Sequence, residues 1–162
     1  MQHQASSPYE ICGIAIIGAG SRGAGYASFA EAHPDEIAIA AVAEPNAHRR
    51  EALASRYKIP EENVCSGWEE LAARDDQFAD AVVIATQDRM HRGPAIAFAE
   101  RRYHLLLEKP MAPTAEECCE IVMAVKKVGI LFAVAHVMRY TRRPSKAISP
   151  YSPRKAPAYT TA

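Results

Sequence analysis

Several features are absent from this sequence, and each absence excludes a class of protein. No apolar run approaches the roughly 20 residues that a membrane-spanning helix needs. Residues 1–10 have neither a basic segment nor an apolar one, so no secretory signal is predicted. The 162 residues carry 19 basic and 19 acidic side chains, and this balance gives no overall field for nucleic acid or an anionic membrane. We therefore expect a cytoplasmic protein that binds neither nucleic acid nor membrane.

Cysteine is also scarce, and its spacing argues against a metal site. The sequence has four cysteines, none of them in a C-x-x-C pair, and its histidines lack zinc-finger spacing. A structural zinc site is therefore not predicted. We interpret the cysteines as buried, reduced thiols, which are typical of a reducing compartment; they are Cys12, Cys65, Cys118 and Cys119.

The sequence does have a regular alternation of short apolar runs and segments of helical length. A parallel sheet buried on both faces has this pattern, because each continuous apolar strand is followed by a crossover helix. The prediction is therefore an α/β fold with a parallel sheet. Strands are predicted over 11–17, 37–43, 64–65, 81–85, 104–108 and 131–135. Helices are predicted over 24–32, 46–58, 68–73, 89–102 and 114–128, the last opened by a capping box at 114–117.

The alternating pattern stops near Tyr140. Residues 141–162 contain four prolines and five basic residues without an acidic one. Such a segment buries too little apolar area to offset its ordering entropy. We predict a flexible N-terminus over 1–10, one folded domain over 11–140 and a disordered basic tail over 141–162.

Residues 18–23 have the sequence G-A-G-S-R-G, which matches G-x-G-x-x-G. The motif follows a predicted strand and opens a helix, which is the context of a dinucleotide site. Its first glycine permits the tight turn, its second lets the backbone approach a pyrophosphate, and its third lets helix and strand pack closely. A glycine-rich turn without a ligand is the alternative. We predict a Rossmann-type, doubly wound sheet whose cofactor-binding turn contributes Gly18, Gly20, Ser21, Arg22 and Gly23.

Glu44 ends the second predicted strand, about 20 residues after this motif. An acidic residue there accepts hydrogen bonds from a ribose 2′-hydroxyl and repels a 2′-phosphate. We therefore predict NAD as the cofactor, with NADP as the alternative because His48 and Arg49 lie close in sequence. Sites for S-adenosylmethionine share a glycine-rich first turn and an acid after the second strand. These two features alone therefore leave a methyltransferase open.

Three later strand ends carry further motifs. These are T-Q-D-R-M-H over 86–91, E-K-P over 108–110 and H-V-M-R-Y over 136–140. In this order, and together with the glycine motif and the acid after the second strand, they resemble the glucose–fructose oxidoreductase, inositol dehydrogenase and rhizopine catabolism family (Gfo/Idh/MocA). The resemblance covers roughly residues 11–141.

The resemblance implies an NAD(P)-binding domain of an oxidoreductase that acts on a sugar- or cyclitol-like secondary alcohol. It implies that Lys109 takes part in proton transfer with the substrate hydroxyl, that His91 or His136 lies near the substrate, and that the Lys109–Pro110 bond is cis. For His136 a structural role is an equal alternative. An open α/β sheet binds ligands at the carboxyl ends of its strands, where all of these residues fall. The cofactor residues added by the resemblance are Thr86, Gln87, His91, Glu108 and Lys109.

The sequence departs from this family after residue 140. Family members continue into a second, α+β domain that carries much of the substrate site, and nothing after Tyr140 resembles it. We therefore expect a truncated chain that is weakly active or inactive alone and that needs the missing domain to bind a polyol. Apolar area exposed near residues 131–135 would favour self-association. The alternative function is a non-catalytic dinucleotide-binding or interaction module.

Overall fold

The computed structural model of the chain describes residues 11–137. The predictions for residues 1–10 and for the tail over 141–162, and the end of the motif over 136–140, lie outside the described residues. The strands are β1 (Cys12–Ile17), β2 (Ile37–Ala43), β3 (Val64–Cys65), β4 (Ala81–Ile84), β5 (His104–Glu108) and β6 (Phe132–Ala135). The helices are α1 (Ser21–Ala27), α2 (Phe29–Ala32), α3 (Ala47–Tyr57), α4 (Trp68–Ala72), α5 (Arg92–Glu100) and α6 (Ala115–Val128), with short 3-10 helices η1 (Glu61–Asn63) and η2 (Asp88–Met90).

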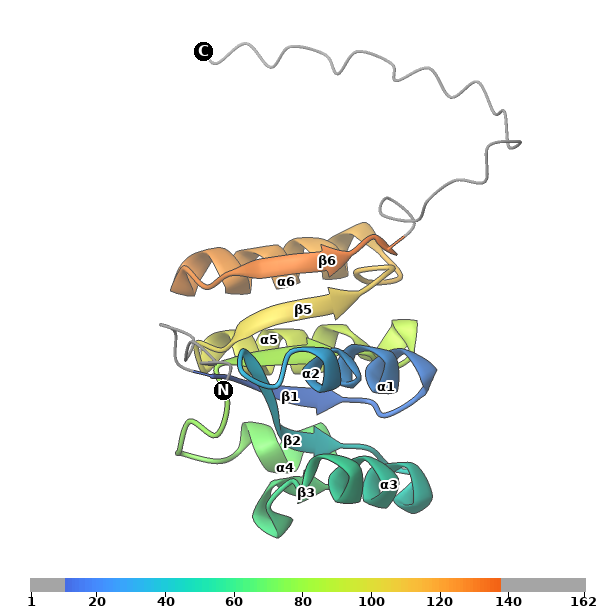
Figure 1. The fold of residues 1–162 in the computed structure, drawn as a ribbon. Coiled ribbons are helices and arrows are strands. Elements are labelled where there is room, and N and C mark those ends of the chain that lie inside the picture. The colour runs from blue at the N-terminus through green and yellow to red at the C-terminus, as the bar shows by residue number, and fades with distance from the viewer. Residues whose placement is uncertain (1–10, 138–162) are drawn as a thin grey trace, which may run out of the picture.

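The strands form one six-stranded sheet in the order β3-β2-β1-β4-β5-β6, and every pair is parallel (Figure 1). This is the strand order of a doubly wound Rossmann sheet, so the predicted fold class is confirmed. The order reverses between β1 and β4. The carboxyl ends of these two strands therefore flank the crevice in which open α/β sheets bind their ligands.

Helices cover both faces of the sheet, as the continuous apolar strands predict (Figure 1). On β1, Ile16 packs toward the face covered by α1, α2 and α3, and its neighbour Ile17 packs toward the face covered by α4, α5 and α6. Val83 and Ile84 of β4 divide in the same way. Each face thus has its own apolar cluster, and the strand ends at the crevice are held from both sides.

Two of the predicted helices are divided in the structure. The helix predicted over 24–32 begins earlier, at Ser21, and is broken at Ser28 into α1 and α2. The helix predicted over 89–102 is the 3-10 helix η2 followed by α5, with Pro94 in the first turn of α5, where its missing N–H is tolerated. The chain leaves α5 through Arg102, whose φ of 66° is the left-handed conformation that glycine favours.

The cysteines differ from the prediction that they are buried. Cys119 is exposed on α6, and the other three are half-buried. Burial raises the pKa of the Cys12 thiol and of the Cys65 thiol, so partial burial still favours the neutral thiol at these two positions. No cluster of metal-ligating side chains occurs within residues 11–137, and none of the helices there is long and apolar enough to span a membrane.

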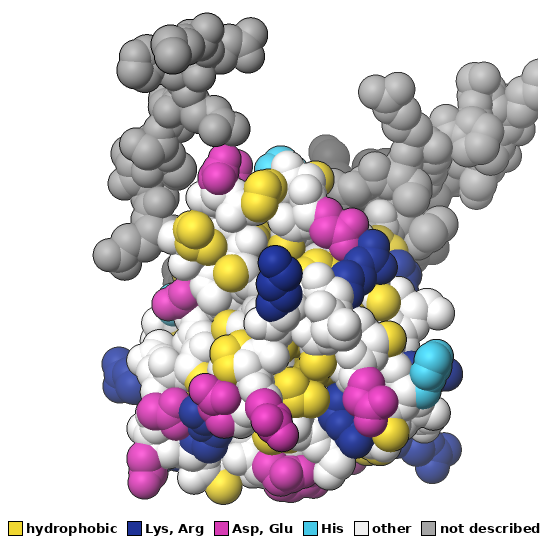
Figure 2. All heavy atoms as spheres, turned by 60° about the horizontal axis from the view of Figure 1, so that its bottom comes forward, with side chains coloured by type: hydrophobic (Ala, Val, Ile, Leu, Met, Phe, Trp, Pro, Cys, Tyr) yellow, Lys and Arg dark blue, Asp and Glu magenta, His cyan; other side chains and the backbone are white. Residues whose placement is uncertain are grey.

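The last strand lies at one edge of the sheet, and large apolar side chains beside it are exposed. Leu131 is 73% exposed, and Met123 on the neighbouring helix α6 is 65% exposed. The face at the opposite, β3 edge has a different character, because acidic and basic side chains are interspersed there with apolar ones (Figure 2).

Candidate functional site

The glycine-rich turn between β1 and α1 packs closely against the end of β4. Gly18 has a φ of +91°, a conformation that residues with a Cβ rarely adopt. A Cβ on Gly18 would also lie 2.8 Å from the carbonyl oxygen of Ala85, just after β4. A Cβ on Gly23 would overlap the carbonyl oxygen of Gly18, so the third glycine lets α1 pack directly against the turn.

Gly20 differs from the other two glycines, because a Cβ there would meet no protein atom within 4 Å. Its φ of −69° and ψ of −171° are open to any residue, so the conformation of the backbone does not require glycine. The open space next to this backbone is the feature expected of the second glycine, which lets a pyrophosphate approach.

Glu44 lies at the end of β2 and is only 7% exposed. Its Oε2 accepts a hydrogen bond of 2.7 Å from the Ala19 backbone N–H, and its Oε1 accepts one of 3.0 Å from the Asn46 N–H. The carboxylate therefore holds the glycine-rich turn against the start of α3. Each carboxylate oxygen has two lone pairs, so this anchoring leaves acceptor capacity for a ligand.

A cavity of about 360 Å³ opens between the ends of β1, β2 and β4. Thr86 lines this cavity, and its buried Oγ1 has no hydrogen-bond partner among the described residues, which is unusual for a buried hydroxyl. The open space at Gly20 and this hydroxyl together fit a ligand with hydrogen-bonding groups. The cavity is lined by Gly18, Gly20, Glu44, Pro45, Asn46, Arg49, Ala85, Thr86, Gln87 and Met90.

Glu108 is the last residue of β5, the next strand across the sheet from β4, and Lys109 and Pro110 follow it. The Lys109–Pro110 peptide bond is cis, as the family resemblance predicts. Lys109 is exposed, whereas Glu108 is only 5% exposed. The Glu108 carboxylate contacts Arg22 and Tyr26 of α1, with Nε of Arg22 3.3 Å from Oε1. Among the described residues these predicted cofactor residues, Glu108 and Arg22, thus contact each other instead of lining the cavity.

His91 is completely buried between the ends of β4 and β5. Its Nδ1 lies 2.8 Å from the carbonyl oxygen of Pro110, and its Nε2 lies 3.2 Å from that of Thr86. Both ring nitrogens therefore face backbone oxygens, and the ring is not presented to the cavity. This geometry makes His91 a bridge between two strand ends and does not support the predicted contact with substrate.

His136 follows β6 at the edge of the sheet and is exposed. Its Nδ1 lies 3.0 Å from the carbonyl oxygen of Val134, two residues earlier in its own chain. The strand β5 separates β6 from β4, and His136 is not among the residues that line the cavity. The described residues therefore do not bring His136 together with the predicted cofactor site.

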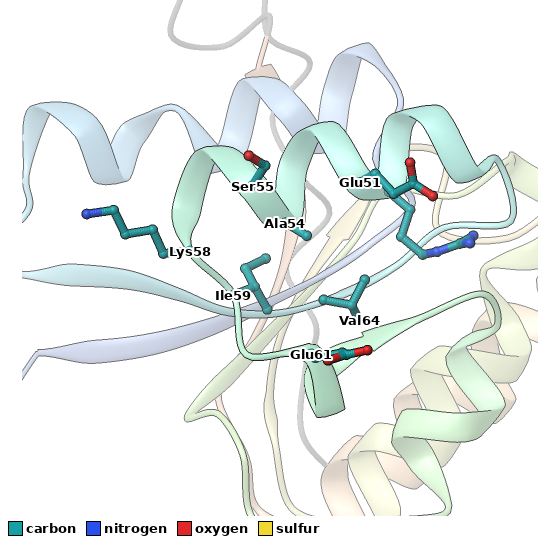
Figure 3. A pocket seen from close by; sticks show the side chains of 8 residues that line it. Glu51, Ala54, Ser55, Lys58, Ile59, Glu61 and Val64 are labelled. Carbon is teal, nitrogen blue, oxygen red and sulfur yellow. The ribbon is translucent and has the colours of Figure 1, made fainter.

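A second hollow, of about 560 Å³, lies between α3 and the η1–β3 segment (Figure 3). Ala54, Ile59 and Val64 face one another across it, whereas Lys58 extends away from them. None of the residues predicted to bind cofactor or substrate lines this hollow. The glycine turn, Glu44 and Thr86 all converge on the first cavity, which is therefore the candidate site.

Some residues of the site were not predicted from the sequence. Pro45 and Asn46 line the cavity because they lie just after β2, and Met90 lines it from the end of η2, which follows β4. Their position after a predicted strand is the signal in the sequence that could have identified them. Tyr26 contacts Glu108 across the sheet, and no local pattern indicates that pairing because the two residues are 82 positions apart.

Comparison with known proteins adds independent evidence. Residues 12–136 match the GFO_IDH_MocA family, described as an oxidoreductase family with an NAD-binding Rossmann fold. The chain is 30% identical over 126 residues to 2,7-anhydro-N-acetylneuraminate hydratase of Escherichia coli, covering 77% of this chain and 32% of that protein. It is 30% identical over 130 residues to inositol 2-dehydrogenase of Streptomyces avermitilis, covering 80% of this chain and 37% of that protein.

Solved structures agree with the sequence comparison. A structure of levoglucosan dehydrogenase in complex with NADH and levoglucosan is 31% identical, with a TM-score of 0.67 over 76% of this chain and 34% of that chain. The chain thus spans about a third of the length of the relatives it matches.

Proposed function

This chain belongs to the Gfo/Idh/MocA family of oxidoreductases, and from that premise we propose that it binds NAD(H) in the cavity between the ends of β1 and β4. The observation that carries the proposal is the convergence of three features on one cavity. These are the open space at Gly20, the carboxylate of Glu44 and the unpartnered hydroxyl of Thr86.

Each feature has a role in this proposal. The backbone at Gly20 approaches the pyrophosphate, because no side chain fills that space. Glu44 accepts hydrogen bonds from the adenosine ribose through the free lone pairs of its carboxylate. Thr86 and Gln87, after β4, line the part of the cavity toward the ribose and nicotinamide. When bound, NAD(H) supplies the hydride acceptor or donor.

Lys109 is the residue that we propose for proton transfer with a substrate hydroxyl. It is exposed at the carboxyl end of β5, next to the cavity-forming strand β4. A general acid or base has to reach the proton that it moves, and an exposed amine at this edge is free to do so. His91, with both ring nitrogens on backbone oxygens, positions the loop that follows Lys109 and does not exchange protons with substrate.

The substrate class of the whole protein is the sugar- or cyclitol-like secondary alcohol that the sequence predicts. Named relatives include inositol 2-dehydrogenase and levoglucosan dehydrogenase, and also a hydratase that acts on an anhydrosugar acid. What these relatives share with this chain is the dinucleotide-binding part.

NAD(H) and reduced thiols are both typical of the cytoplasm, so the proposal includes that location.

A non-catalytic dinucleotide-binding module is the second candidate function for this chain alone. It is favoured by the places of the two histidines, because neither buried His91 nor exposed His136 lines the cavity. A methyltransferase has no comparable support, since the matched family is one of NAD-binding oxidoreductases.

The Glu44→Ala variant tests the assignment of the cavity. We expect the wild-type chain to prefer NADH to NADPH, because the Glu44 carboxylate repels a 2′-phosphate. In the variant this preference should fall by about tenfold, which corresponds to about 1.4 kcal/mol. Parallel titrations with both cofactors measure the ratio, and Glu51→Ala on the exposed side of α3 is the matched control. A wild-type chain that binds NADPH more tightly than NADH would contradict the role of Glu44.

The isolated chain is expected to bind cofactor without appreciable dehydrogenase activity. Orienting the substrate accounts for about 7–11 kcal/mol of barrier lowering, and the chain spans only about a third of the relatives that it matches. Turnover is measured by NADH formation with a panel of polyols and anhydrosugars. Rates in the ordinary enzyme range of about 1–10³ s⁻¹ would contradict this expectation, and their loss in Lys109→Ala would assign them to this site.

A further inference from the structure

The buried carboxylate of Glu108 is held by a side chain from the opposite end of the domain sequence. The Tyr26 hydroxyl, on α1, donates a hydrogen bond of 2.7 Å to Glu108 Oε1. The other oxygen, Oε2, accepts a hydrogen bond of 2.9 Å from the backbone N–H of Lys109. One carboxylate therefore connects the helix that follows the glycine-rich turn to the backbone of the proposed acid–base residue.

These contacts fix the backbone position of Lys109, from which its side chain extends. The Lys109 N–H is directed at a carboxylate that is itself anchored, so the Cα of Lys109 has a defined position relative to α1. The same helix α1 is preceded by its N-cap residue Gly20, where the proposed pyrophosphate site lies. The contact thus joins two parts of the site that come from strands β1 and β5.

We propose that Tyr26 is a positioning residue that orients Lys109 toward the cofactor cavity by holding the Glu108 carboxylate. The significance of that orientation rests on the proposed NAD(H) function, whereas the contact itself does not. Tyr26 touches neither cofactor nor substrate in this scheme, because its hydroxyl is directed at Glu108.

Tyr26 is better suited to this role than Arg22, the other side chain at Glu108. Arg22 is 54% exposed, and its Nε lies 3.3 Å from the same oxygen, so this ion pair is open to solvent and to exchange of partners. The Tyr26 hydroxyl makes the shorter contact. Burial, together with the neighbouring Glu108, raises the pKa of Tyr26 to about 12, so the phenol stays protonated and remains a donor at neutral pH.

The chain offers a matched control for removing this hydroxyl. Tyr57, on α3, donates a hydrogen bond of 2.8 Å to Glu31 Oε1, and its pKa is likewise raised to about 12. This second tyrosine–glutamate pair involves neither Glu108 nor any residue that lines the cavity. Tyr26→Phe and Tyr57→Phe therefore remove the same chemical group from the same kind of contact.

The test uses NMR on the full chain without cofactor. We expect Tyr26→Phe to speed hydrogen exchange of the Lys109 backbone amide by about tenfold and to shift the signal of lysine labelled with ¹³C at Cε. That signal is assigned by its absence in Lys109→Arg. Tyr57→Phe should leave both Lys109 signals unchanged. Thermal unfolding of both variants separates a general loss of stability, which would move them alike, from the specific effect on Lys109.

The outcomes distinguish this proposal from the proposed function. Lys109 signals in Tyr26→Phe that match those of the wild type overturn the positioning role, whatever the chain binds. Lys109 signals that move equally in both variants also overturn it, because the effect is then general. Addition of NADH to the wild type tests the function separately, since absence of binding there contradicts the NAD(H) proposal and leaves the measured effect of Tyr26 on Lys109 in place.

Discussion

Gly20→Val is expected to abolish NADH binding and to leave the domain folded. The Cβ of residue 20 would point into open space, so the protein itself accommodates the larger side chain. The φ and ψ of Gly20 are also available to valine. The pyrophosphate is proposed to contact the backbone in this same space, and the isopropyl group of valine there would exclude it. We expect affinity to fall by at least about 100-fold, equivalent to about 2.8 kcal/mol.

Gly25→Val is the matched control for this substitution. Gly25 is exposed on α1, and its Cβ would also meet no atom within 4 Å, but it does not line the cavity. NADH titration by fluorescence should give wild-type affinity for Gly25→Val and no saturation for Gly20→Val, with both variants showing wild-type circular dichroism. A folded Gly20→Val protein that binds NADH with wild-type affinity would show that the pyrophosphate does not bind at this turn.

Gly23→Ala is expected to destabilise the domain by about 3 kcal/mol, the upper range for overpacking a well-packed position. The added methyl would overlap the backbone carbonyl of Gly18, which is held in place by the hydrogen bond from Gly18 N–H to the Ala43 oxygen. The backbone cannot rotate out of the way as a flexible side chain would. Helix α1 therefore has to move away from β1.

Thermal or urea unfolding measures this effect. For a domain of this size, about 3 kcal/mol corresponds to a decrease in Tm of roughly 10 °C. Gly25→Ala, in open space on the same helix, should instead be neutral or stabilising by about 0.5–1 kcal/mol, because alanine is the better helix former. Equal stability of Gly23→Ala and the wild type would show that the third glycine is not needed for the packing of α1.

The sheet was predictable from the sequence because its strands are buried on both faces. The strands predicted over 37–43 and 104–108 are β2 and β5 to the residue, because short apolar runs between segments of helical length are typical of a parallel sheet. The Asn46 cap of α3 and the Gly129 end of α6 were also predictable, because both signals are local in sequence. At α6 only the Thr114 half of the capping box is present, with its side chain accepting from Glu117 N–H.

The site was predictable in its composition and less so in its contacts. The glycine motif and the acid after the second strand indicated Gly18, Gly20 and Glu44, and the family resemblance added Thr86. The structure brings these four residues together at one cavity. Which side chains contact one another depends on the three-dimensional arrangement of strand ends. The burial of His91 against two backbone carbonyls and the pairing of Tyr26 with Glu108 are contacts of this kind, and neither follows from spacing.

Glu44 has two roles, and the sequence indicated only one of them. Its position after β2 indicated a ribose ligand. The structure adds that its carboxylate holds the Ala19 N–H of the glycine-rich turn. Substitution of Glu44 should therefore weaken NADH binding as well as the preference over NADPH, which is why the ratio of the two affinities is the informative quantity.

That the cavity between β1 and β4 binds NAD(H) is tested most directly by titration of the ¹⁵N-labelled chain with NADH. We predict saturable binding with a Kd below about 1 mM, in the range common for cofactor and substrate sites, with the largest amide shifts at Gly20, Glu44, Thr86 and Gln87. Absence of saturation, or shifts confined to the hollow between α3 and β3, would contradict it.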